Sequence, residues 1–210
     1  MTTAPRSSAK NRIYTAALEH FVVNGYDGAS LNNIAEMVGI RKASLYAHFK
    51  SKDELFQQLL EDALSTESAF VESCFALNKN SMTTTENPAT DPMQIDRCGQ
   101  AYCQALRERY IQSMPLRFLI RTAYVPPVHL MQHIKDRYQD YIDCLIHAFQ
   151  AELQQYIDLP AAQQRLYSDA YVGVIDSLHV DLLYSGLDNF DRRLQSMLYL
   201  LELALKQLRL

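Results

Sequence analysis

A polar run at residues 41–52 carries the kinds of side chain that bind nucleic acid. Arginine and lysine pair with guanine edges or with phosphates, and serine and tyrosine hydroxyls suit phosphate oxygens. With the helix-capping Ser30 included, the candidate DNA-binding residues are Ser30, Arg41, Lys42, Ser44, Tyr46, His48, Lys50 and Lys52. Lys50 and Lys52 stand at the start of a predicted helix, where backbone N–H groups also favour phosphate. A solvated basic face is the alternative interpretation of the three lysines.

Three short helices are predicted to position these side chains. Apolar residues recur every four positions over Ile13–Phe21, which predicts an amphipathic helix of about 14 residues that ends at Gly25. Ser30 is a good N-cap for a second short helix, and Gly39 separates that helix from a third at about residues 41–47. This order is the helix-turn-helix arrangement, whose last helix can enter the major groove of DNA.

The distribution of charge supports the same interpretation. The 210 residues carry a formal net charge of −4, which by itself argues against a nucleic-acid binder. Residues 1–52, however, hold seven basic and three acidic residues, a balance of +4, and this leaves −8 for residues 53–210. We therefore predict a DNA-binding domain at residues 1–52, with a short N-terminal arm, and a second domain at residues 53–210. The arm, with Arg6 and Lys10, is predicted to be a solvated tail. The alternative is that it lies along the phosphate backbone or in the minor groove of DNA.

The N-terminal segment resembles the DNA-binding domain of the TetR family of bacterial repressors. The resemblance covers about residues 10–56 and rests on the run Ser30-Leu31-x-x-Ile34-Ala35-x-x-x-Gly39-Ile40-x-Lys42-x-Ser44-Leu45-Tyr46-x-x-Phe49-x-x-Lys52-x-x-Leu55. It implies that Lys42, Tyr46, His48 and Lys52 lie where members of that family contact DNA, with Tyr46 and Lys52 on phosphates. It also implies an all-helical C-terminal domain for ligand binding and dimerisation.

The chain departs from the family pattern at three positions. Arg41 stands where a small hydroxyl residue usually caps the recognition helix, Ala29 replaces a common threonine, and Ala43 replaces a common glycine. These changes put the identity of the operator in doubt and leave DNA binding itself in place.

The sequence of residues 53–210 predicts helices separated by short breaks. The chain has only six glycines and seven prolines, which disfavours many strands and tight turns. Further helices are predicted at about residues 52–77, 95–113, 115–125, 128–157, 162–184 and 188–208, with a polar loop at 78–94. The fold class is therefore all-α with about nine helices.

A homodimer is expected, because one helix-turn-helix unit reads too few base pairs. The last helix repeats leucine at a heptad-like spacing, and the helix before it is apolar on more than one face. The predicted interface residues are Val174, Leu178, Leu182, Leu194, Leu198, Leu201 and Leu205. An intramolecular hairpin core is the alternative.

Aromatic residues in the middle of the chain suggest a ligand pocket. The candidates are Tyr102, Tyr110, Phe118, Arg121, Tyr138, Tyr141 and Tyr171, a set suited to a small hydrophobic or aromatic inducer. The same side chains also fill ordinary helical cores. Arg117 and Arg121, one turn apart, can clamp a carboxylate, although an ion pair or surface position is favoured.

Other functions find weaker support. His129 and His133, one turn apart, have a spacing that binds a divalent metal, and Cys98 and Cys103 are candidate redox sensors. The cysteines lack a CxxC pair, which favours buried thiols in a reduced, cytoplasmic protein. No membrane span, secretory signal, cofactor motif or catalytic motif is recognised, so an enzyme is not predicted.

Together, the motif and the resemblance predict a ligand-responsive transcriptional repressor. It would bind a palindromic double-stranded DNA operator as a dimer, and a small molecule bound in the C-terminal domain would release it. The helix at about residues 52–77 would be the lever between the two domains. One alternative is a regulator of the same fold that answers to a protein partner, without an inducer. The other is a metal or redox sensor.

Overall fold

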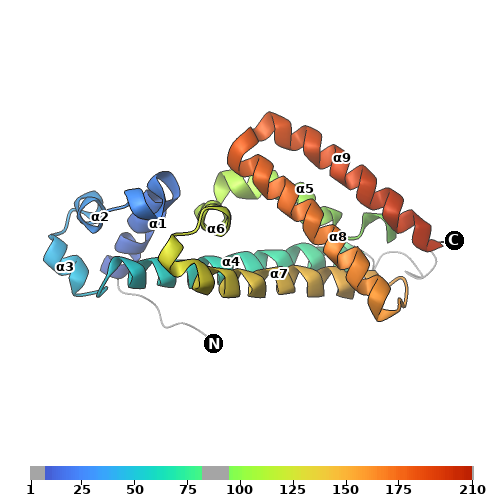
Figure 1. The fold of residues 1–210 in the computed structure, drawn as a ribbon, viewed down its shortest axis with the longest axis horizontal. Coiled ribbons are helices and arrows are strands. Elements are labelled where there is room, and N and C mark those ends of the chain that lie inside the picture. The colour runs from blue at the N-terminus through green and yellow to red at the C-terminus, as the bar shows by residue number, and fades with distance from the viewer. Residues whose placement is uncertain (1–7, 82–94, 210) are drawn as a thin grey trace. The chain divides into compact units, whose positions relative to one another are not determined.

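The computed structural model describes residues 8–81 and 95–209, and every regular element in these two ranges is helical (Figure 1). The α-helices are α1 Ser8–Gly28, α2 Leu31–Val38, α3 Lys42–Tyr46, α4 Lys52–Ser81, α5 Gln100–Gln112, α6 Met114–Tyr124, α7 Met131–Leu153, α8 Ala161–Val180 and α9 Leu187–Lys206. Short 3₁₀ turns lie at Ile95–Arg97, Val128–Leu130 and Gln207–Arg209, and a π turn lies at Asp181–Ser185. Over the described residues, the predicted all-α fold with about nine helices is confirmed.

Most helix boundaries fall close to the predicted ones. Helix α4 continues to Ser81, so the first residues of the predicted loop 78–94 are helical, and residues 82–94 lie outside the described residues. Helix α7 ends at Leu153, a turn earlier than predicted. None of the described helices is long and apolar enough to cross a membrane.

The chain divides into two compact units. The first unit consists of two segments, the chain up to Thr66 and Ser113–Arg137. The second unit consists of Glu67–Gln112 and Tyr138–Leu210. Helices α4 and α7 each begin in the first unit and continue into the second. The first unit thus holds α6 and the beginnings of α4 and α7 as well as the three N-terminal helices. The domain boundary between residues 52 and 53 stays a prediction.

An aromatic cluster forms the core of the first unit. The Phe21 ring meets the Phe56 ring edge-on at 5.1 Å, and Phe56 meets Phe118 of α6 at the same distance. Helix α1 packs against both α2 and α6. Its regular part ends at Gly25, whose φ of 69° and ψ of −176° are not helical, as the Asn24-Gly25 pair predicts.

Tyrosine rings fill the core of the second unit. Tyr171 stacks on Phe149 with ring centroids 4.4 Å apart, and its hydroxyl donates to the carbonyl of Gly99 at 3.0 Å. Gly99 has a φ of 76°, and a Cβ there would lie 2.4 Å from the Tyr171 ring. Only glycine allows this close approach between the turn before α5 and the middle of α8.

The seven residues predicted for the dimer interface lie buried inside the second unit, and their part in a dimer stays a prediction. Val174, Leu178, Leu182, Leu194, Leu198, Leu201 and Leu205 are each 8% exposed or less within the single chain. The physical reason is that α9 uses its leucine seam to pack on α8 and α5 of the same chain. The exposed large apolar side chains of these helices and the π turn are Leu166, Val180, Tyr184, Tyr199, Leu200 and Leu203.

The predicted pocket residues are divided between the two units. Phe118 belongs to the aromatic core of the first unit, and the Arg121 side chain lies against Gly25 of that unit. The five tyrosines, Tyr102, Tyr110, Tyr138, Tyr141 and Tyr171, lie in the second unit. Tyr102 and Tyr141 are fully buried and share a hydrogen bond between their hydroxyls. These two residues and Tyr171 are core side chains, the role that aromatic residues also take in helical cores.

Candidate nucleic-acid interface

Helix α2 is capped at both ends by the residues that flank it in the sequence. The Ser30 hydroxyl accepts a hydrogen bond from the Asn32 N–H at 3.2 Å, so Ser30 is the N-cap, as predicted. At the other end, Gly39 takes the left-handed conformation, with a φ of 73° and a ψ of 34°, and its N–H donates to the Glu36 carbonyl. This glycine turn sets the direction in which α3 leaves α2.

Buried side chains hold helix α3 in place, and most of its other residues are exposed. Leu45 and Phe49 are fully buried and anchor the helix. The exposed residues around them are Arg41, Lys42, Ala43, Ser44, Tyr46, Ala47, His48 and Lys50. The Lys42 ammonium lies 5.8 Å from the centre of the Tyr46 ring, one turn further on. Arg41, at the N-cap, makes no side-chain capping bond, and its side chain is exposed.

Lys52 has surroundings that differ from those of the other candidate contacts. Its ammonium donates to the carbonyl of Tyr26 at 2.9 Å and to the carbonyl of Ala29 at 3.1 Å. The same ammonium lies 4.1 Å from the centre of the Tyr26 ring. Lys52 therefore joins the first turn of α4 to the end of α1, and most of its hydrogen-bonding capacity is spent inside the unit. The phosphate contact implied by the resemblance stays a prediction that this geometry does not favour.

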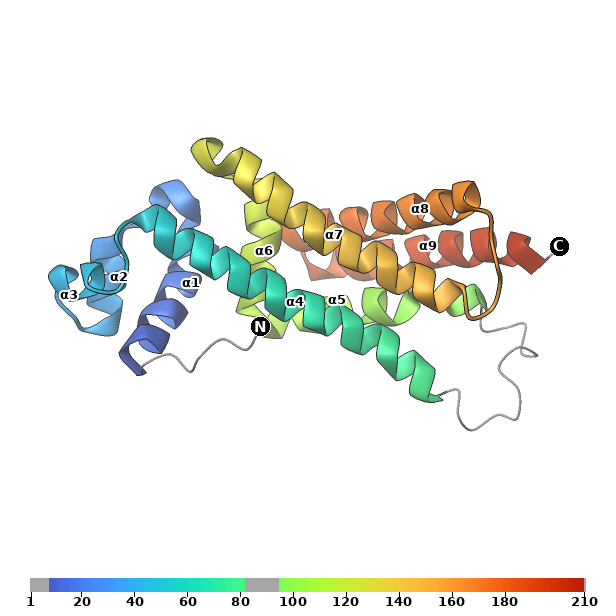
Figure 2. The ribbon, with the colours of Figure 1, turned by 90° about the horizontal axis from the view of Figure 1, so that it is seen from below.

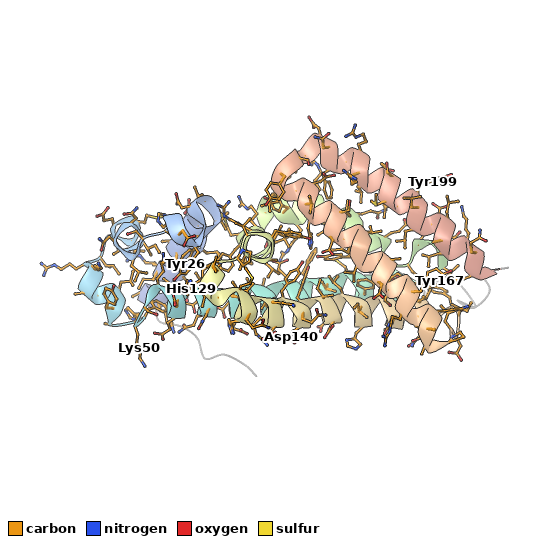
Figure 3. All side chains as sticks on the ribbon, viewed as in Figure 1. Tyr26, Lys50, His129, Asp140, Tyr167 and Tyr199 are labelled. Carbon is orange, nitrogen blue, oxygen red and sulfur yellow. The ribbon has the colours of Figure 1, made fainter. Side chains whose placement is uncertain are left out.

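Side chains at the start of α4 accept hydrogen bonds from nearby backbone N–H groups. The Ser51 hydroxyl accepts from the Glu54 N–H at 3.1 Å, and the Glu54 carboxylate accepts from the Lys50 N–H at 2.6 Å. Figure 3 shows the Lys50 side chain pointing away from the ribbon. Phosphate binding at this point would thus depend on the Lys50 side chain more than on the helix N-terminus.

Two basic residues of α1 take part in the packing of the helix-turn-helix unit. The Lys10 ammonium lies 5.4 Å from the centre of the Phe49 ring, and Arg12 donates to the Val38 carbonyl at the end of α2. Arg6, in the N-terminal arm, lies outside the described residues. Sequence spacing gave no signal for these ring and carbonyl contacts, because they join residues far apart in the chain.

Among the candidate sensor residues, His129 makes a structural contact and Cys98 and Cys103 are buried. The His129 Nε2 lies 3.3 Å from the Asp53 carboxylate. Burial raises the pKa of Cys98 well above its usual range and that of Cys103 to about 12, which disfavours the reactive thiolate form. No group of three or more metal-ligating side chains is found among the described residues.

The geometry describes a helix-turn-helix domain with a basic recognition face, and comparison with known proteins agrees. Residues 13–59 match the family model described as bacterial regulatory proteins, tetR family. The chain is 38% identical over 56 residues to the biofilm operon icaADBC HTH-type negative transcriptional regulator IcaR of Staphylococcus epidermidis, a match of 27% of this chain and 30% of that protein. It is 47% identical over 49 residues to IcaR of Staphylococcus aureus strain Newman, 23% of this chain and 26% of that protein.

Solved structures of similar fold cover nearly the whole chain. A TetR-like transcriptional regulator from Rhodococcus sp. RHA1 has a TM-score of 0.60 at 17% identity, over 98% of this chain and 97% of that one. The fatty acid degradation regulator FadR from Bacillus halodurans has a TM-score of 0.67 at 15% identity, over 95% and 97%. FadR from Bacillus subtilis, in complex with stearoyl-CoA, has a TM-score of 0.60 at 17% identity, over 91% and 97%. At these identities the likeness shows the fold alone.

The match to the TetR family model lies in the N-terminal domain, where the sequence resemblance predicted it. The curated relatives are matched over less than a third of their length.

Proposed function

We propose that the protein is a transcriptional repressor that binds double-stranded DNA with the exposed face of α3. The observation that carries the proposal is the α3 geometry: buried Leu45 and Phe49 fix the helix, and Arg41, Lys42 and Tyr46 face outward. The curated relatives that match part of the chain are negative transcriptional regulators, which supports repression. A DNA-binding regulator acts where the chromosome is, which in a bacterium is the cytoplasm.

Selection of DNA from a random library tests this proposal. The full-length protein should enrich a palindromic sequence, and fluorescence anisotropy should then give a specific affinity at least ~1,000-fold above that for random DNA. Lys42→Ala and Arg41→Ala should relax the base preference of the selected site, because these side chains reach base edges. Enrichment of no sequence, or equal affinity for selected and random DNA, would contradict the proposal.

The second part of the proposal is a homodimer formed by α8 and α9. Their large exposed apolar side chains are Leu166, Val180, Tyr199, Leu200 and Leu203, to which the π turn adds Tyr184. Figure 3 shows Tyr199 on the outer side of α9. A second copy of the chain is the occupant that a palindromic site requires, because the symmetry of the operator mirrors that of the protein. The dimer therefore uses the outward faces of these helices, and their leucine seam serves the core.

The third part is release by a small molecule bound in the second unit. Stearoyl-CoA in the structure of Bacillus subtilis FadR supports an acyl chain as the first ligand to test. The alternative, a regulator without an inducer, is supported by the tyrosine core, where Tyr102, Tyr141 and Tyr171 are buried and hydrogen-bonded. Titration of the protein–operator complex with stearoyl-CoA separates the two: dissociation at micromolar ligand supports the acyl ligand.

A further inference from the structure

Two electrostatic contacts join α4 to the start of α7 within the first unit. His129, in the 3₁₀ turn that leads directly into α7, pairs with Asp53, and Arg137 makes two hydrogen bonds of 2.7 and 2.6 Å to the Glu61 carboxylate. Asp53 and Glu61 are eight residues apart, and so are His129 and Arg137. The two contacts follow the same order along both segments, so the turn and the start of α7 run in the same direction as α4, as Figures 1 and 2 also show.

Asp53 is also bonded to the end of α1. The Tyr26 hydroxyl donates to one oxygen of the Asp53 carboxylate, and His129 lies 3.3 Å from the other oxygen. The His129 ring meets the Tyr26 ring with centroids 5.1 Å apart, and Figure 3 shows the two residues together. The hydrogen bond from Tyr26, followed by the one from His129, lowers the pKa of Asp53, so the acceptor keeps its charge. Tyr26, Asp53 and His129 thus form one cluster, which joins α1, α4 and the turn before α7.

This cluster is linked to the start of α2 through Lys52. The carbonyl of Tyr26 accepts from Lys52, and Lys52 also binds the carbonyl of Ala29, the residue before the N-cap of α2. The position of Tyr26 therefore affects both the first turn of α4 and the point at which α2 begins. The 3₁₀ turn that holds His129 leads directly into α7. A shift of α7 would therefore be passed to α2 through Asp53 and Tyr26.

We propose that Tyr26, Asp53 and His129 are positioning residues for DNA binding, which hold the start of α2 and α3 at the angle that fits the major groove. His129 is the residue through which the α6–α7 connection acts on this angle. The inference rests on the proposed function for its DNA readout, and none of the three side chains needs to touch DNA.

The test replaces His129 in the full-length protein. His129→Leu removes the hydrogen bond to Asp53, while His129→Gln keeps a nitrogen donor of similar reach. His133→Leu is the matched control, since His133 is a half-buried histidine one turn further along α7, and its Nε2 has no hydrogen-bond partner among the described residues. Two quantities are measured: the affinity for the selected operator, and hydrogen exchange of the amides of residues 26–31 in the protein without DNA.

His129→Leu should weaken operator binding roughly three- to tenfold, the range expected for loss of a partly exposed hydrogen bond to a carboxylate, and speed exchange at residues 26–31. His129→Gln and His133→Leu should behave as the wild type does in both measurements. Unchanged exchange in His129→Leu, or equal losses in His129→Leu and His129→Gln, would overturn the inference. If the wild type binds no DNA, the proposed function fails, and the exchange measurement still decides whether the cluster positions α2.

Discussion

Lys50 and Lys52 show how much the surroundings of a side chain decide its role. Both were candidates for phosphate contact, being two residues apart at the start of one helix. The Lys50 side chain is exposed, whereas the Lys52 ammonium is bonded to two main-chain carbonyls and lies over an aromatic ring. At the residue scale the first is available to DNA and the second holds the fold.

This difference predicts opposite results from the same substitution. Lys50→Ala should leave stability within about 0.5 kcal/mol of wild type and reduce the slope of log K against log salt by about 1. Lys52→Ala should cost about 1–3 kcal/mol of stability, because two carbonyls lose a charged donor. Urea unfolding and salt titration of operator binding measure the two effects. A Lys52→Ala protein as stable as the Lys50→Ala protein would contradict the assignment.

His179 predicts a pH dependence of stability. Its ring is fully buried in α8 with no hydrogen-bond partner for either nitrogen among the described residues, and burial lowers its pKa from 6.5 to about 3. Because the folded pKa lies below the unfolded one, the stability is complete above pH 6.5 and is lost as the pH falls toward 3. At pH 5 the loss should be about 2 kcal/mol relative to pH 7.

His179→Leu should therefore lose about 2 kcal/mol less than the wild type between pH 7 and pH 5. It should also be more stable at pH 7, because two buried nitrogens without partners are removed. His147→Leu, at an exposed histidine of α7, serves as the control and should keep the wild-type pH dependence. Urea unfolding at both pH values measures these differences, and parallel losses in wild type and His179→Leu would exclude the assignment.

At the scale of elements, two glycine turns fix how helices follow one another. Gly39 turns the chain between α2 and α3, and Gly99 turns it between the 3₁₀ turn Ile95–Arg97 and α5. The two glycines have nearly equal φ angles of 73° and 76°. Their surroundings differ, since nothing lies within 4 Å of an added Cβ at Gly39, whereas one at Gly99 would meet the Tyr171 ring.

Alanine at each glycine separates backbone strain from steric clash. Gly39→Ala should cost about 1–2 kcal/mol, the penalty for a side chain in the left-handed region. Gly99→Ala carries the same penalty together with a clash at 2.4 Å, so we expect it to cost at least ~2 kcal/mol more. Thermal unfolding followed by circular dichroism gives the comparison. Equal midpoints for the two variants would show that the Tyr171 ring moves aside freely.

Local patterns predicted the elements better than their partners. Ser30, Gly39 and the spacing of Ile13–Phe21 act within a few residues, so the helices they define could be predicted from sequence. The leucines of α9 keep the same spacing whether they face α8 of their own chain or a second copy, and the pattern could not decide between these. The Tyr26–Asp53–His129 cluster joins three segments that are far apart in the chain, and no local pattern indicates that they meet.

At the scale of the whole molecule, the exposed apolar side chains of α8 and α9 indicate an interface with a partner. Tyr199, Leu200 and Leu203 are between 40% and 63% exposed on α9, and Leu166 is 64% exposed on α8. Exposed apolar side chains gathered on two neighbouring helices are typical of interfaces in soluble proteins. A second copy satisfies both this surface and the symmetry of a palindromic site.

Lysine at two of these positions should break the dimer. The double variant Leu200→Lys/Leu203→Lys would bury four ammonium groups in a symmetric interface, and we expect dimer affinity to fall at least ~100-fold. Ile111→Lys, at an exposed apolar position of α5, adds the same kind of charge and should leave the dimer intact. Sedimentation velocity gives the oligomeric state, and circular dichroism confirms that each variant is folded. Operator affinity should fall with the dimer, because a single recognition helix contacts one half-site. Persistence of the dimer in the double variant, or its loss in Ile111→Lys, would place the interface elsewhere.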